Sequence, residues 1–178
     1  LRNDSRPIHL EVVYKFYLYD PEQGGDEIAK WVGPNKKDNL LKKLTKLKEK
    51  QLPLLYNPLS RPVLEKVGLS IDELEQFVYF KAQLFVPYKS ERIVFDQLNE
   101  DCVRGFYIPF NQLEQLEPYS FYIPVKADWL IDPYQEVDWM DFNEFYKKVS
   151  FQIEQNKSPL CWIKLQDKNL QKCFVVFW

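Results

Sequence analysis

The chain has 178 residues, of which 46% are hydrophobic and 16% aromatic, with a formal net charge of −2; this excludes a disordered chain and fits one domain, or one domain with a large appendage. The near-neutral charge excludes a general electrostatic attraction to nucleic acid, so any such attraction has to be local. The sequence has three widely spaced cysteines and one histidine, which argues against a zinc site or a catalytic triad, and it has no Gly-rich phosphate loop. It also has no secretory signal and no apolar run long enough for a membrane span, which favours a cytoplasmic protein.

The first residues are expected to form a hairpin. Residues 3–7 (NDSRP) are rich in turn-forming side chains, yet only Leu1 and Arg2 come before them. We therefore expect that the chain begins inside a hairpin whose first strand lies upstream. An ordinary frayed N-terminus is the alternative.

A long strand is predicted over residues 8–19, which are rich in β-branched and aromatic side chains. Because side chains alternate between the two faces of a strand, Glu11 and Lys15 share one face. A carboxylate that holds a divalent cation, beside a lysine that positions or activates water, would form a phosphate site. Glu11 is thus a candidate ligand of Mg²⁺, and Glu11 with Lys15 a candidate catalytic pair. An ion pair at a sheet surface is the alternative.

A lysine-rich helix is predicted from Lys36 to Lys50, with Asn35 as its N-cap. This segment holds seven lysines against Asp38 and Glu49. Such a local positive charge would attract a nucleic-acid backbone, although a solvated helix face is the alternative. The candidate nucleic-acid-binding residues are Asn35, Lys36, Lys37, Lys43 and Lys46. The predicted buried stripe of this helix is Leu40, Leu41, Leu44 and Leu47.

The rest of the chain mixes strands with short helices. After a break at residues 58–62 and a short helix, residues 70–73 form a predicted capping box whose helix continues to Phe80. Strands are predicted next at residues 81–88 and 104–110, the second at a sheet edge because it contains Pro109. The later predicted elements are a short helix at residues 112–116, a strand at 121–125, a helix at 138–156, and a hairpin of 160–166 with 170–178.

Several segments together resemble one family. In chain order they are HLEVVYKFYL, WVGPNKKDNLLKKLTKLKEKQL, AQLFVP, RGFYIP, ADWL and CFVVFW. They resemble the bacterial domain-of-unknown-function family 1853 across essentially the whole chain. The most specific part lies in the first fifty residues, and the family has no established activity.

That family in turn is similar to the PD-(D/E)xK nuclease-like superfamily. In this superfamily an acid on one strand joins an acid and a lysine on the next strand to hold magnesium at a scissile phosphate. The resemblance implies that Glu11 and Lys15 are the second half of this set and that the first acid lies just before Leu1. The usual spacing is acid-x-Lys, whereas Lys15 follows Glu11 by four residues, about 13 Å along an extended strand.

The resemblance implies an α/β fold: a restriction-endonuclease-like mixed sheet flanked by helices, with extra C-terminal strands and a helix. Residues 1–88 would form the C-terminal part of a nuclease-like core, and residues 89–178 a strand-rich extension packed on it. The expected function is a Mg²⁺-dependent phosphodiesterase acting on DNA. The alternative is a catalytically degenerate domain that binds nucleic acid or another protein.

Overall fold

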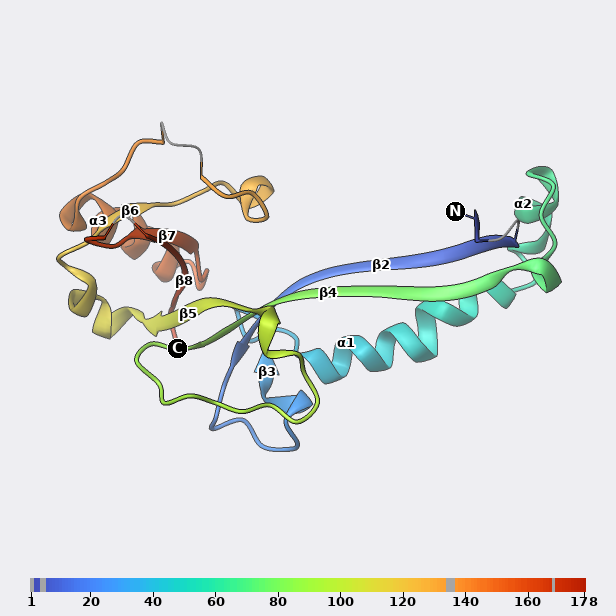
Figure 1. Ribbon diagram of the computed structural model, residues 1–178, viewed down its shortest axis with the longest axis horizontal. Helices are drawn as coiled ribbons and strands as arrows, with labels where there is room; N and C mark the ends of the chain where they lie inside the picture. The colour runs from blue at the N-terminus through green and yellow to red at the C-terminus, as the bar shows by residue number, and fades with distance from the viewer. Residues whose placement is uncertain (1, 4–5, 134–136, 168) are drawn as a thin grey trace.

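The protein folds around one mixed sheet with helices packed against it (Figure 1). The computed structural model describes residues 2–3, 6–133, 137–167 and 169–178. The strand order is β1-β2-β4-β5-β8-β7-β6, and β3 pairs with β2 beside this path. The β2–β4, β4–β5 and β5–β8 pairs are parallel and the others antiparallel. This architecture confirms the predicted α/β class.

The strands are β1 (Arg2–Asn3), β2 (Arg6–Tyr19), β3 (Trp31–Val32), β4 (Glu75–Pro87), β5 (Val103–Pro109), β6 (Ser120–Tyr122), β7 (Leu160–Lys164) and β8 (Leu170–Val176). The α-helices are α1 (Leu40–Lys46), α2 (Arg61–Lys66) and α3 (Phe142–Glu154). The shorter helical turns are η1 (Ile28–Lys30), η2 (Leu47–Gln51), η3 (Leu52–Tyr56), η4 (Ile71–Glu73), η5 (Glu100–Cys102), η6 (Phe110–Leu116) and η7 (Lys126–Asp128). Across the described residues, no helix combines the length and apolar character that a membrane crossing requires.

Figure 1 shows two regions, a slender extension and a thicker body. We call residues 6–16 and 40–83 the arm, and the remaining described residues from 17 onward the head. In the arm, β2 and β4 run side by side, and the helical run of α1, η2 and η3 lies along one face of this pair. The sheet continues from the arm into the head through the pairing of β4 with β5.

The start of the chain pairs as a hairpin, although Asn3, Arg6 and Pro7 of the predicted turn are strand residues. β2 covers the predicted strand, and its first residues pair antiparallel with β1 in the register Arg2↔Pro7 and Asn3↔Arg6. The other two residues of the predicted turn, 4 and 5, lie outside the described residues.

The predicted helix after residue 70 is wrong. Only the 3₁₀ turn η4 forms there, and the Ser70 side chain makes no capping hydrogen bond. β4 follows and pairs with β2 over eleven consecutive positions, from Ile8↔Glu75 to Leu18↔Phe85. A long parallel ladder satisfies the backbone of both strands, and it overrides the local capping signal.

The lysine-rich helix begins later than predicted. Its N-cap is Asn39, whose side-chain oxygen accepts a hydrogen bond from the Lys42 backbone N–H at 2.8 Å. The preceding residues form a turn closed by a hydrogen bond from Lys36 N–H to the Gly33 carbonyl, and Lys36 has a φ of +52°. A residue in this left-handed conformation cannot belong to a right-handed helix, so Asn35 is not a helix cap.

The head holds the largest apolar core of the described chain. It packs α3 and η6 against β6, β7 and β8, and its fully buried side chains include Phe121, Phe145 and Val175. The predicted C-terminal hairpin is confirmed as β7 and β8. The predicted edge position of β5 is wrong, since β5 lies between β4 and β8; Pro109 fits there because it is the last residue of the strand.

Candidate functional site

Glu11 and Lys15 both contact groups on the helix-bearing side of the arm. The Glu11 Oε1 atom accepts a hydrogen bond from Gln51 Nε2 at 2.9 Å, and Gln51 is the last residue of η2. Lys15 Nζ lies 3.1 Å from Asp38 Oδ2, in the segment just before α1. Val13, which lies between them on β2, is buried. The predicted sharing of one face therefore matches the strand alternation.

A chain of hydrogen bonds connects Glu11 to a lysine of the helix. Lys43 Nζ donates to Gln51 Oε1 at 2.6 Å, and Gln51 donates in turn to Glu11. The amide thus carries the effect of a positive charge to the carboxylate, and it fixes the orientation of Glu11. η2 is a π-helical turn, a geometry that is frequent at functional sites.

Lys15 has a separate partner. Its ion pair with Asp38 is partly exposed, so solvent weakens it. In the part of the chain that the structure describes, no hydrogen bond or ion pair joins Glu11 to Lys15 directly. Nor do the described residues include a group of three or more His, Cys, Asp or Glu side chains close enough to hold a metal ion. Magnesium needs one or two carboxylates besides substrate phosphate and water, and Glu11 meets the lower limit of this requirement.

Lys15 also lines a pocket of about 450 Å³ where the arm meets the head. Its walls include Tyr14 and Phe16 of β2, together with Lys126 and Trp129 of the head. The ring of Trp129 packs edge-on against Phe16, with 5.4 Å between ring centroids. A ligand at Lys15 would therefore have a wall of aromatic side chains beside it.

Two of the predicted nucleic-acid-binding residues make contacts within the head. Asn35 Oδ1 accepts a hydrogen bond from the Ser158 backbone N–H at 2.9 Å. Lys36 Nζ forms an ion pair with the buried Asp20 at 2.8 Å and lies 3.9 Å from the centroid of a ring of Trp178. These contacts bring distant parts of the chain together.

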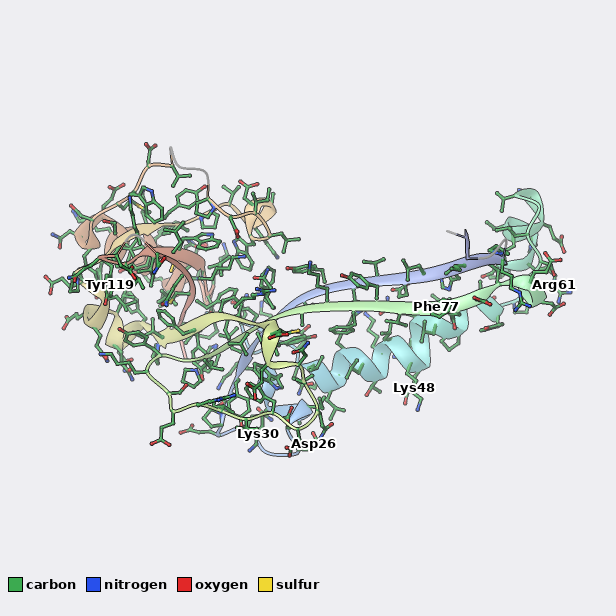
Figure 2. The ribbon with its side chains drawn as sticks, viewed as in Figure 1. Asp26, Lys30, Lys48, Arg61, Phe77 and Tyr119 are labelled. Carbon is green, nitrogen blue, oxygen red and sulfur yellow. The ribbon has the colours of Figure 1, made fainter. Side chains whose placement is uncertain are left out.

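Of the other predicted nucleic-acid-binding residues, Lys43 donates the hydrogen bond to Gln51 that connects it to Glu11, whereas Lys37 and Lys46 are exposed. The helical run exposes further lysines, and Figure 2 shows Lys48 projecting on the side away from the strands. We call Lys42, Lys46, Lys48 and Lys50 the lysine surface. Within the described ranges, none of these four has a carboxylate at ion-pair distance.

Sequence reasoning did not identify the partners of the site. It did not predict that Gln51 contacts Glu11 or that Asp38 contacts Lys15. Both contacts depend on the turn at residues 33–36 and on the helical run lying along β2, and neither spacing nor composition signals such an arrangement.

The comparisons with known proteins give one match. The model of the family described as "Domain of unknown function (DUF1853)" matches residues 1–176. The searches of curated proteins and of solved structures give no match. Since the family model covers nearly the whole chain, the protein belongs to the DUF1853 family.

Proposed function

We propose that this domain binds nucleic acid through the lysine surface of the arm. The observation that carries the proposal is that four exposed lysines of one helical run lack carboxylate partners among the described residues, although the chain as a whole has a net charge of −2. A phosphate backbone would supply the missing negative charges. Glu49 is the one acid within this run, so the local charge stays strongly positive.

Binding of this kind depends steeply on salt. Each phosphate that a lysine neutralises releases counterions, and the slope of log K against log salt is about −0.9 per contact for duplex DNA. We expect fluorescence anisotropy of a labelled duplex to show tight binding at low salt and weak binding near physiological salt.

A matched pair of double variants tests the proposal. Lys46→Gln with Lys50→Gln removes two charges from the lysine surface, whereas Lys66→Gln with Lys89→Gln removes two exposed charges elsewhere. The first variant is expected to make the salt slope shallower by about 2, and the second to leave it nearly unchanged. Equal losses of duplex affinity in both variants would show that binding depends on the net charge of the protein and not on the lysine surface. No duplex binding by the unsubstituted chain at low salt would leave a protein as the partner.

A second candidate function is Mg²⁺-dependent cleavage of a DNA phosphodiester. The observation that favours it is the Lys43–Gln51–Glu11 chain on the same side of the arm as Lys15. Glu11 would hold the ion, and Lys15, released from Asp38, would position or activate water. Bound Mg²⁺ would supply charge stabilisation at the phosphate. This proposal also assigns the chain to a bacterial, cytoplasmic branch of the PD-(D/E)xK nuclease-like superfamily.

Nicking of supercoiled plasmid measures this activity. We expect nicking that requires Mg²⁺ and is lost in Glu11→Gln and in Lys15→Met, while Glu49→Gln, a substitution at an exposed acid of η2, keeps it. Cleavage that is indifferent to the first two substitutions removes the cleavage proposal. Salt-dependent binding without any cleavage identifies the domain as a binding module.

A further inference from the structure

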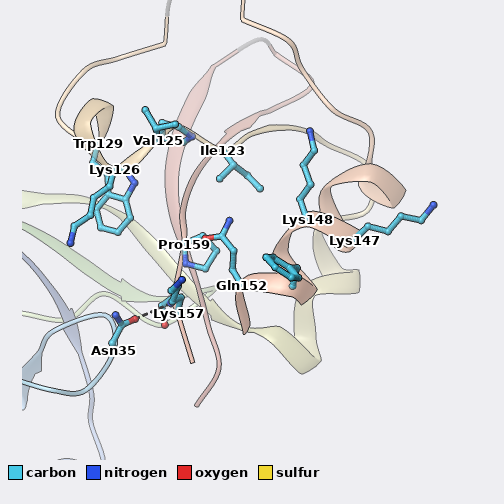
Figure 3. Close-up of a pocket in the computed structure, with 13 residues that line it drawn as sticks. Asn35, Ile123, Val125, Lys126, Trp129, Lys147, Lys148, Gln152, Lys157 and Pro159 are labelled. Carbon is cyan, nitrogen blue, oxygen red and sulfur yellow. Dashed lines mark hydrogen bonds between the residues drawn. The ribbon is translucent and has the colours of Figure 1, made fainter. Parts of the chain in front are cut away.

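A large pocket lies in the head, away from Glu11. It has a volume of about 970 Å³ and lies between α3, the segment of residues 123–129 and the segment of residues 157–159 (Figure 3). Its apolar walls include Ile123, Pro124, Val125 and Pro159. This volume accommodates a ligand the size of a nucleotide.

Four lysines line this pocket, and the described residues contribute no acid to its lining. The lysines are Lys126, Lys147, Lys148 and Lys157. Lys148 is paired with Glu144 at 2.7 Å. In the described residues, the other three have no carboxylate within ion-pair distance. A chain with a net charge of −2 has thus gathered cations around one apolar cavity, which favours an anionic ligand.

The wall of the pocket also contains a buried hydroxyl that lacks a partner. Ser158 is only 3% exposed, and among the described residues no group forms a hydrogen bond with its Oγ. Its backbone N–H is used by Asn35. A buried polar group without a hydrogen bond destabilises a fold, so a rotation of the Ser158 side chain toward a polar ligand atom in the pocket would remove that cost.

Two aromatic side chains complete the lining. Trp129 is packed against Phe16 and Phe174, whereas Phe151 of α3 is 66% exposed and has no role in the core. A flat ring between these walls would bury apolar area, and nucleic-acid bases stack on such side chains in single-strand-binding proteins.

The pocket shares part of its wall with the smaller pocket at Lys15. Asn35, Lys126 and Trp129 line both this pocket and the smaller one that contains Lys15. A strand whose phosphate lies near Lys15 could therefore place its next nucleotides toward α3.

We propose that this pocket holds the terminal nucleotide of a nucleic-acid single strand. Lysines would bind its phosphate, Phe151 or Trp129 would stack on its base, and Ser158 would form a hydrogen bond with it. The inference rests on the proposed nucleic-acid binding and adds a preference for strand ends.

The test uses dTMP, thymidine and a 5′-phosphorylated hexathymidylate in isothermal titration calorimetry. We expect dTMP and the hexathymidylate to bind, and thymidine to bind at least about tenfold more weakly, because thymidine offers no charged phosphate to the lysines. Lys147→Gln with Lys157→Gln should weaken dTMP binding about tenfold. Phe151→Ala should weaken it about fivefold or more through lost stacking. The matched control, Lys66→Gln with Lys89→Gln, should have no effect.

Several results would overturn the inference. Equal binding of thymidine and dTMP, equal losses in the pocket and control variants, or no dTMP binding would each do so, as would decanoate binding more tightly than dTMP. The Lys46→Gln/Lys50→Gln variant separates the two proposals, since it should weaken duplex binding and leave dTMP binding intact. Duplex binding without dTMP binding refutes only the pocket. Because Lys147, Lys157 and Phe151 are exposed, unchanged melting temperatures confirm that these variants fold.

Discussion

The arm and the head share one sheet, but its two faces are covered differently. In the head, α3 and η6 pack on the sheet, and Phe121, Phe145 and Val175 are completely buried. In the arm, the helical run covers one face of β2 and β4. On the other face Val12 is 61% exposed and Tyr79, its register partner, is 56% exposed.

Parallel strands are usually covered on both faces, so the arm depends on fewer apolar contacts than the head. It also carries the lysine surface and the Glu11 hydrogen-bond chain. Regions that bind ligands often belong to the less stable parts of a fold. The comparison suggests that the head supplies most of the stability and the arm most of the proposed function.

The largest expected effect is in the head. The rings of Phe121 and Phe145 stack with centroids 4.0 Å apart. Phe145→Ala should lower the free energy of unfolding by about 3–5 kcal/mol, because it leaves a cavity in a close-packed core. Phe151→Ala on the same helix is the control, and its exposed side chain should cost less than about 0.5 kcal/mol. Denaturant unfolding measures both, and similar losses would contradict this description of the head.

The corresponding change in the arm should cost less. Leu47 is one of the few buried side chains there, and Leu47→Ala is expected to cost about 2 kcal/mol, the low end for such substitutions. The control is Leu41→Ala, at an exposed position of α1. Native-state hydrogen exchange should show faster exchange in residues 40–56 and little change in α3. A loss as large as that of Phe145→Ala would remove the contrast between the two regions.

The Glu11–Gln51 hydrogen bond should contribute about 1 kcal/mol, since it involves a charged acceptor but is partly open to solvent. A double-mutant cycle with Glu11→Ala and Gln51→Ala measures this coupling in the free energy of unfolding. Additive losses would show that the two side chains do not interact in solution, and they would weaken the cleavage proposal.

The smallest effect concerns a charge in the head. Burial lowers the pKa of the Lys172 ammonium; nearby Asp132 opposes this shift, and Arg104 adds to it. The unfolded chain therefore holds this proton more tightly, so stability should rise with pH in the range below the ordinary lysine pKa of about 10.4. Lys172→Met should lose this rise.

The measurement is the free energy of unfolding as a function of pH, for the unsubstituted chain and for Lys172→Met. Burial raises the pKa of Tyr17 and of Tyr107. These tyrosines therefore lose their protons first in the unfolded chain, and the stability of both proteins should fall above about pH 10. Parallel curves of stability against pH for the unsubstituted chain and Lys172→Met would refute the assignment to Lys172.

Much of the fold could be predicted because its signals are local. Alternation identified β2, helical spacing identified α3, and the turn-forming residues 167–169 in the sequence identified the C-terminal hairpin. The second half of β4 was predicted as a strand, but its first half was assigned to a helix because the capping pattern at Ser70 is local, whereas the partner that makes the segment a strand lies 67 residues earlier, in β2. Residues 35 and 39 are both asparagine, and only the backbone turn decides which one caps the helix.

The site was predictable to the same degree. Alternation placed Glu11 and Lys15 on one face, but the partners Gln51 and Asp38 come from tertiary packing. The lysines divide for the same reason: Lys36 is held by Asp20 and Lys43 by Gln51, whereas Lys46 remains exposed. The sequence shows how many lysines this segment contains, but only the tertiary contacts show which of them are exposed.

Hydrogen exchange with and without a closed DNA dumbbell, which is a duplex without free ends, tests the division between arm and head most directly. At low salt we predict slower exchange in residues 40–56 on addition of the dumbbell, with no change in α3 or β8. Protection confined to the head, with the helical run of the arm unaffected, would contradict the account.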